Sequence, residues 1–289
     1  MLLIKLDNLI EGTILKRPSA FIKSPYVADI QCSNTDEIYL GHTASLGCCG
    51  LAEVNSSVLI SENKESKTKP KNQAGLKCTH TVFLSVVKHG TNENIIGIHP
   101  KLAEQLVESA LTKNCLSSLL NIKKFRKETT IFIKDKVDSR FDFTGIDSNG
   151  IPFIMEVKNV PLADYEDLDK KDRGKHDFSD RDYNSKVAYF PDGYRKKSED
   201  TVSPRALKHI RELTLIKTSD PKIRCIMCYV IQRIDVNRFQ PSIVDPQYRE
   251  AFKTAFKVGV EIITLVVSWN KKGEAYFVRD NLPIVHDDI

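Results

Sequence analysis

The sequence predicts an α+β fold in which a unit of short strands precedes a mixed sheet flanked by helices. Over the first ninety or so residues, short β-like segments alternate with Ser, Asn, Gly and Pro. Beyond them, segments with helical spacing of apolar residues and strand-like runs follow in the order α-β-β-β-α-β-α-β, which is typical of a sheet covered by helices. We therefore divide the chain into residues 1–95 and 96–289.

The first unit contains four strand-like segments separated by turn residues, at 14–16, 26–31, 57–61 and 79–87. A polar stretch at 62–77, rich in Lys, Asn, Glu and Ser, lies between the last two. Short strands around polar loops indicate a small barrel or sandwich, and an OB-type barrel is one candidate.

The second unit begins with a helix at 99–111, whose Pro100 suits a first turn. Strands at 129–134, 141–146 and 151–157 follow, and Asp147-Ser148-Asn149-Gly150 is a hairpin turn signal between the last two. The remaining elements are a helix at 204–216 capped by Ser203, a strand at 224–231, a helix at 248–258 and a strand at 260–268. A densely charged segment at about 164–188 interrupts this pattern, and we interpret it as a surface insertion.

The composition indicates a folded protein in a reducing, cytoplasmic compartment. It is 41% hydrophobic and 28% charged, with a net charge of +5, which is compatible with a phosphate-binding face and equally with an ordinary metabolic enzyme. No apolar run is long enough to span a membrane, and the start does not have the pattern of a secretory signal. Seven cysteines without framework spacing indicate reduced thiols, and we expect Cys225 and Cys228, in an apolar run, to be structural rather than metal ligands.

The candidate catalytic residues lie on the two strands that the predicted turn connects. Asp142 is near the start of the second strand of the group, and Glu156 and Lys158 close the third. Alternation along a strand places Glu156 and Lys158 on the same side, and the hairpin brings Asp142 next to them. The result is the D…E-x-K arrangement of a large group of nucleases.

The chemistry of phosphodiester hydrolysis explains these residue types. Two carboxylates hold Mg²⁺ (or Mn²⁺), which lowers the pKa of a bound water, and the lysine adds positive charge near the scissile phosphate. Glu128, just before the first strand of the group, is a candidate for a further metal-binding carboxylate. The alternative is a surface ion pair across the hairpin, formed by Asp142 or Glu156 with Lys158 or Arg140.

The helix at 204–216 carries four polar residues at three- and four-residue spacing: Arg205, Lys208, His209 and Glu212. They share a face that could present the cations to phosphates, with His209 or Glu212 near the metal. The alternative is a solvated face with a Lys208–Glu212 ion pair, and the spacing alone favours that alternative.

Several motifs in the same order resemble the sugar fermentation stimulation protein A (SfsA) family. The strongest are Ser139-Arg140-Phe141-Asp142-Phe143, Glu156-Val157-Lys158-Asn159-Val160-Pro161-Leu162, Tyr189-Phe190-Pro191-Asp192-Gly193 and Arg205-Ala206-Leu207-Lys208-His209-Ile210-Arg211-Glu212-Leu213. The resemblance implies an N-terminal OB-like barrel followed by a PD-(D/E)XK nuclease-like domain. It places the family motif on Asp142, Glu156 and Lys158, with Arg205, His209 and Glu212 in the helix behind.

The chain also departs from the family pattern. The N-terminal Asn-Thr-Gly turn of the family is Asn34-Thr35-Asp36 here, and an Arg-Gly pair is Arg205-Ala206. These departures affect the N-terminal binding surface and leave the D…E-x-K residues intact. The leading hypothesis is a Mg²⁺- or Mn²⁺-dependent nuclease acting on DNA, with RNA as the alternative substrate. A DNA-binding regulator without hydrolytic activity, as in the family's link to sugar utilisation in bacteria, and a protein-interaction module are the competing hypotheses.

Overall fold

The computed structural model describes residues 1–285 except 36, 44–49, 64–76 and 192–199. Its largest sheet has seven strands, whose order across the sheet is β1, β16, β15, β13, β10, β9 and β8. The three central strands, β10 (Pro152–Val160), β13 (Arg224–Ile231) and β15 (Glu261–Trp269), run parallel to one another. The outer strands are antiparallel to their neighbours: β1 (Leu2–Lys5), β8 (Lys124–Ile133), β9 (Val137–Ile146) and β16 (Glu274–Arg279). The mixed sheet expected from the sequence is confirmed.

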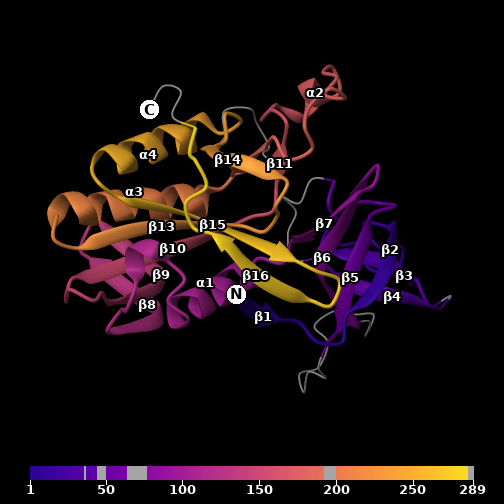
Figure 1. Cartoon of the computed structure of the whole chain (residues 1–289), viewed down its shortest axis with the longest axis horizontal. Helices are drawn as coiled ribbons and strands as arrows, with labels where there is room; N and C mark the ends of the chain where they lie inside the picture. The colour runs from indigo at the N-terminus through magenta and orange to yellow at the C-terminus, as the bar shows by residue number, and fades with distance from the viewer. Residues whose placement is uncertain (36, 44–49, 64–76, 192–199, 286–289) are drawn as a thin grey trace.

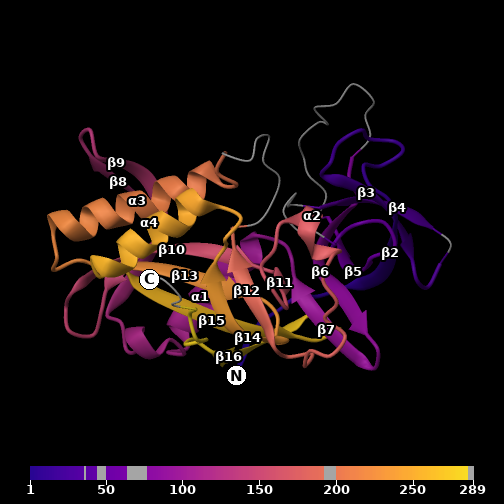
Figure 2. The ribbon, with the colours of Figure 1, turned by 90° about the horizontal axis from the view of Figure 1, so that it is seen from above.

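Helices cover both faces of this sheet (Figures 1 and 2). Helix α1 (Lys101–Thr112) packs on one face in a core with Phe143, Met155 and Cys228. Helices α3 (Pro204–Ser219) and α4 (Pro246–Lys257) pack on the other face. The side chains of Ser203 and Asp245 cap these two helices by accepting hydrogen bonds from Ala206 N and Tyr248 N, so the predicted Ser203 cap is confirmed.

The N-terminal unit forms a six-stranded sheet in the order β4, β3, β2, β5, β6 and β7. These strands are β2 (Ile10–Lys16), β3 (Val27–Cys32), β4 (Ile38–His42), β5 (Ser57–Glu62), β6 (His80–His89) and β7 (Asn92–Gly97). An additional parallel pairing of β4 with β6 connects five of them in a ring. This pairing does not by itself make the closed barrel that the sequence predicts. Residues 64–76 of the predicted polar loop lie outside the described residues.

The charged segment is more ordered than a surface insertion. It contains β11 (Ala163–Asp164) and the short helix α2 (Lys170–Arg173), and it ends in β12 (Lys186–Phe190). Strand β12 is largely buried and pairs with β11 and with β14 (Val236–Pro241) in a three-stranded sheet. The sequence prediction missed β12 because the charges before it dominate the local composition.

A buried ionic cluster joins the three sheets. Asp235, 1% exposed, follows β13 and accepts two hydrogen bonds from the Arg233 guanidinium, at 2.6 and 2.7 Å. Its carboxylate also accepts from Lys186 Nζ of β12 and from Asn94 Nδ2 of β7, both at 2.6 Å. Arg233 in turn donates to the carbonyl of Pro161 at 3.0 Å. These bonds fix the six-stranded sheet and the three-stranded sheet against β13.

The first strand of the chain lies in an unexpected place. Residues 2–5 pair with β16 at the edge of the seven-stranded sheet, whereas the sequence assigns them to the N-terminal unit. The division of the chain at residue 95 stays a prediction. Among the described residues, no helix is both long and apolar enough to cross a membrane.

The structural role predicted for Cys225 and Cys228 is confirmed. Both are free and buried, and they lie in the cores on opposite faces of the sheet. Two thiols on opposite faces cannot ligate one metal ion. Cys48 and Cys49 lie outside the described residues.

Candidate functional site

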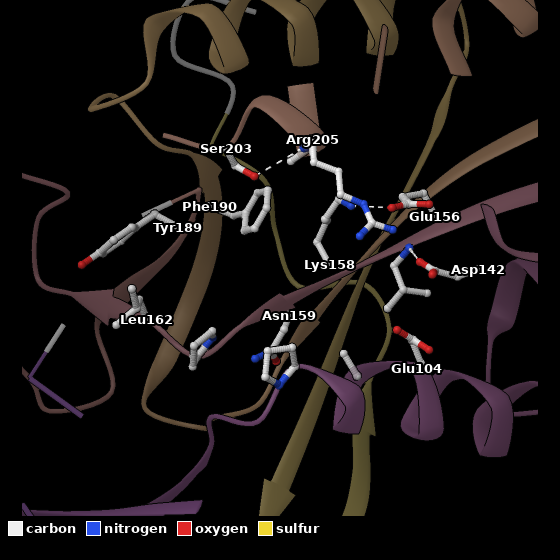
Figure 3. Close-up of a pocket in the computed structure, with 15 residues that line it drawn as sticks. Glu104, Asp142, Glu156, Lys158, Asn159, Leu162, Tyr189, Phe190, Ser203 and Arg205 are labelled. Carbon is white, nitrogen blue, oxygen red and sulfur yellow. Dashed lines mark hydrogen bonds and ion pairs between the residues drawn. The ribbon is translucent and has the colours of Figure 1, made fainter. Parts of the chain in front are cut away.

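A cavity of about 320 Å³ opens between α1, the end of β10, β12 and the start of α3 (Figure 3). Asp142, Glu156 and Lys158 line it together with Arg205, so the structure brings these four predicted residues into one pocket. The remaining lining residues include one further carboxylate, Glu104, and an apolar group on the opposite side: Pro161, Leu162, Tyr189 and Phe190.

Asp142 is positioned by the end of a strand ladder. The pairing of β9 with β10 stops at Phe143 and Met155, so no described strand residue pairs with Val157 on that side. The Asp142 carboxylate instead accepts the hydrogen bond from Val157 N, at 2.7 Å. The side chain is thereby fixed against the strand that carries the other two residues.

Glu156 and Lys158 extend from β10 toward α3. Lys158 Nζ donates to Glu156 Oε1 at 2.5 Å, and His209 Nδ1 of α3 is hydrogen-bonded to the same oxygen. His209 is 4% exposed and packs on the ring of Phe141, with ring centroids 5.8 Å apart. His209, one of the predicted supporting residues, thus contacts Glu156 directly and orients its carboxylate.

Charge and burial act differently on the two carboxylates. Burial and the neighbouring negative charge of Glu156 raise the pKa of Asp142 to about 7, against the Val157 hydrogen bond and the Lys158 charge. Burial also acts to raise the pKa of Glu156, but the Lys158 charge and the His209 hydrogen bond outweigh it and hold that pKa below its usual range. The pocket thus contains one firmly ionised carboxylate beside another that binds a proton near neutrality.

The helix face predicted from spacing divides into two parts. Arg205 is exposed and directs its guanidinium into the pocket (Figure 3). Lys208 and Glu212 instead bind the backbone of Asp138, the second residue of β9: Lys208 Nζ donates to Asp138 O at 2.6 Å, and Glu212 Oε1 accepts from Asp138 N at 3.0 Å. Lys208 and Glu212 also form an ion pair at 3.7 Å, which is the pair that the alternative interpretation of this helix face predicts. These two residues fix the strand that carries Asp142.

Two further predicted residues do not reach the pocket. Glu128 lies on β8 with its side chain 57% exposed, and it pairs with Arg140 of β9 at 3.5 Å. Neither residue lines the cavity. The sequence places Glu128 just before a strand, whereas it lies within β8, at a position where the backbone has a φ of +51° and the side chain is exposed.

Glu104 is a pocket residue that sequence reasoning missed. It lies in the first turn of α1 and contributes to the raised pKa of Asp142 through its charge, after burial and Glu156. Within the sequence it is one polar residue of an amphipathic helix. Only the packing of α1 against β10 reveals that this position faces the two strands.

The donor set suits a divalent cation that keeps much of its water. Among the described residues, no group of three or more His, Cys, Asp or Glu is arranged to hold a metal ion. Mg²⁺, however, is commonly bound through one or two carboxylates together with water and substrate phosphates. Oε2 of Glu156 is buried and receives no hydrogen bond from the described residues, and Asp142 carries an unfavourable buried charge when ionised. A cation between these carboxylates would compensate both.

Comparison with known proteins identifies relatives along most of the chain. The model of the sugar fermentation stimulation protein RE domain matches residues 180–273. A sugar fermentation stimulation protein homolog from Crocosphaera subtropica is 30% identical over 260 residues, which is 88% of this chain and 87% of the relative. A homolog from Ruegeria is 28% identical and covers 95% of this chain and 97% of its own length.

A solved structure shares the fold. SfsA of Pyrococcus furiosus, in complex with Ca²⁺, superposes with a TM-score of 0.72 at 19% identity and covers 99% of both chains. The agreement of sequence relatives and fold over nearly the whole length confirms the resemblance that the motifs indicate. The chain belongs to the sugar fermentation stimulation protein (SfsA) family.

Proposed function

We propose that this chain is a divalent-metal-dependent nuclease of the PD-(D/E)XK type that hydrolyses phosphodiester bonds, with DNA as its main substrate. The observation that carries the proposal is the meeting of Asp142 with Glu156 and Lys158 in one pocket, from two neighbouring strands. A surface ion pair would need no buried second carboxylate, and Glu156 is 2% exposed. Placing the half-buried carboxylate of Asp142 beside the buried one of Glu156 is costly unless a cation compensates their charges.

Asp142 and Glu156 would hold Mg²⁺ or Mn²⁺, which when bound supplies an activated water and neutralises charge on the phosphate. The Val157 N–H and the His209 ring orient the two carboxylates. Lys158 places a positive charge beside Glu156, where a scissile phosphate would bind. Arg205 adds a planar guanidinium at the rim of the pocket, suited to two phosphate oxygens.

The SfsA of Pyrococcus furiosus supports the choice of a divalent ion, because its structure is a complex with Ca²⁺. We extend the binding of a divalent cation to this chain. We also assign the six-stranded sheet as an OB-like, nucleic-acid-binding unit. Its loop between β2 and β3 exposes two aromatic rings, Phe21 and Tyr26, that could stack on bases.

A cleavage assay tests the proposal directly. With Mg²⁺, the purified chain is expected to cut single- or double-stranded DNA or RNA, and Lys158→Ala is expected to lower the rate by ~10²–10³-fold because one stabilising charge is lost. Glu156→Ala is expected to lose at least as much. Absence of metal-dependent cleavage of every substrate, or cleavage by both variants at the rate of the wild-type chain, would contradict the nuclease. Salt-dependent DNA binding without cleavage would support the non-catalytic regulator instead.

Glu104 provides a more selective test of the pocket. Glu104→Gln is expected to raise the Mg²⁺ concentration for half-maximal cleavage by ~10–100-fold, the usual effect of removing an outer-shell group. Glu108→Gln is the matched control, one turn further along α1, where the carboxylate binds Lys127 at 2.7 Å outside the pocket. A metal titration of the cleavage rate distinguishes them. Identical titrations for the two variants would remove Glu104 from the site.

A further inference from the structure

We infer that the pocket contains a nucleoside subsite in which Phe190 stacks on one unpaired base next to the reacting phosphate. This inference rests on the proposed nuclease function and specifies its substrate. It assigns a role to the Tyr189-Phe190 pair, which the hydrolytic chemistry leaves unused. Asp192 and Gly193, which follow the pair in the family motif, lie outside the described residues.

The pocket has two chemically different ends (Figure 3). Asp142, Glu156, Lys158 and Arg205 lie at one end, Leu162 and Tyr189 lie at the other, and all of them line the cavity. The Phe190 ring lies between Tyr189 and the side chains of Lys158 and Arg205. A nucleotide has the same division, since a charged phosphate is joined through its sugar to a flat, largely apolar base. The order of groups in the pocket therefore matches the order of groups in one nucleotide.

The Phe190 ring is held in place before any ligand arrives. It packs against Tyr229 and Tyr248, with ring centroids 5.7 and 5.3 Å away. The hydroxyls of these two tyrosines are hydrogen-bonded to each other at 2.6 Å, and both rings are fully buried. Phe190 itself is half-buried, and it lines the cavity. A rigid ring with an accessible part can stack on a base with little loss of side-chain entropy.

Asn159 separates the two ends and is also fixed. Its side-chain oxygen accepts a hydrogen bond from Gln232 Nε2 at 2.6 Å, and Gln232 Oε1 accepts from Trp269 Nε1 at 2.9 Å. This chain of bonds connects the floor of the pocket to the core of the seven-stranded sheet. The part of the pocket lining directly after Lys158 is thereby fixed before any ligand binds.

The size of the cavity matches one unpaired nucleotide. At about 320 Å³ it lies at the lower end of the ~300–1,000 Å³ range of ligand pockets. A base can enter such a pocket only after leaving its stack and its pairing partner. That separation costs least in a single strand or a frayed end. We therefore expect single-stranded DNA to be cut faster than the same sequence in a duplex.

Binding of two small probes tests the subsite without catalysis. Thymidine 5′-monophosphate and deoxyribose 5-phosphate share the phosphate and sugar, and only the first has a base. With Ca²⁺ present, calorimetry is expected to show that the full-length chain binds the nucleotide ~5- to 150-fold more tightly, the effect of stacking one base. In Phe190→Leu, which keeps an apolar side chain against the tyrosines, this ratio is expected to approach one.

Phe132→Leu is the matched control, because this ring on β8 is 70% exposed and lies outside the pocket. It should keep the wild-type ratio. If the wild-type chain bound the two probes equally, no base would stack on Phe190, and the subsite would be overturned. Failure of the wild-type chain to bind either probe would also overturn it. The same loss in both variants would also overturn it. The cleavage assay decides the nuclease separately, because equal binding with retained cleavage removes only the subsite.

Discussion

Replacing Asp142 by asparagine is expected to stabilise the metal-free protein above pH 7 while lowering cleavage by at least ~10²-fold. The asparagine side chain keeps an oxygen that can accept the hydrogen bond from Val157 N. The substitution removes the negative charge of Asp142, which burial and Glu156 disfavour. The same negative charge is proposed to bind the metal ion. Stability and activity therefore change in opposite directions, as is common at functional sites.

The pH dependence follows from the raised pKa of Asp142. The folded chain binds this proton up to about pH 7, whereas the unfolded chain releases it near the ordinary value of 3.8. Between these values the folded state holds more protons, so the free energy of unfolding falls as the pH rises from about 4 to 7. A difference of about three pH units corresponds to at most ~4 kcal/mol.

Urea unfolding of the metal-free protein at pH 5 and pH 8 measures this effect. Asp142→Asn is expected to exceed the wild type in stability at pH 8 and to match it more closely at pH 5. Asp138→Asn is the control, because it makes the same change at an exposed position of the same strand. If Asp142→Asn were less stable than the wild type at pH 8, the carboxylate would be stabilising the fold rather than serving a cation.

Asp235→Asn is expected to destabilise the fold by ~3–5 kcal/mol, the largest loss we predict for a single substitution. Its carboxylate neutralises two buried cations: Arg233 is 4% exposed and Lys186 is 9% exposed. Asparagine keeps one acceptor oxygen but has no charge, so both positive charges remain buried without compensation, and its NH2 group cannot accept the hydrogen bonds that Lys186 and Arg233 donate to the second oxygen. Because the cluster joins three sheets, the damage would not be confined to one of them.

The free energy of unfolding in urea at neutral pH provides the measurement. Glu166→Gln is the matched control, because it breaks a single ion pair with Arg181 that is exposed on both sides. Such a pair contributes ~0–1 kcal/mol. Comparable losses in the two variants would show that the buried cluster is not a major source of stability.

The sequence predicts the second unit well because its elements are long and periodic. The apolar run that became β13 is buried along nearly its whole length, and the capped helix at α3 begins one residue after Ser203, as expected. Strands β1, β4, β7, β14 and β16 escaped prediction. They are four to six residues long, and β1, β4, β7 and β14 lie at the ends of the strand orders of their sheets.

The residues of the candidate site divide in the same way, into those that local sequence predicts and those that depend on long-range packing. Asp142, Glu156 and Lys158 could be predicted because a tight turn at Asp147–Gly150 joins their strands, and local geometry then sets their proximity. Glu104, Tyr189 and Phe190 reach the pocket from other elements. Their arrival depends on the packing of α1 and on the parallel pairing of β12 with β14, neither of which leaves a local sequence signal.

The pairing of β1 with β16 has a consequence for biosynthesis. Leu2 of β1 lies opposite Tyr276 of β16, so the ribosome synthesises β1 long before β16. At ~5–20 residues per second, tens of seconds separate them. Throughout that interval the earliest segment of the nascent chain lacks its native neighbour, and Leu3, buried in the finished core, remains accessible to chaperones or to wrong pairings. An affinity tag fused at the amino end would lengthen the segment that has to find this late-arriving edge.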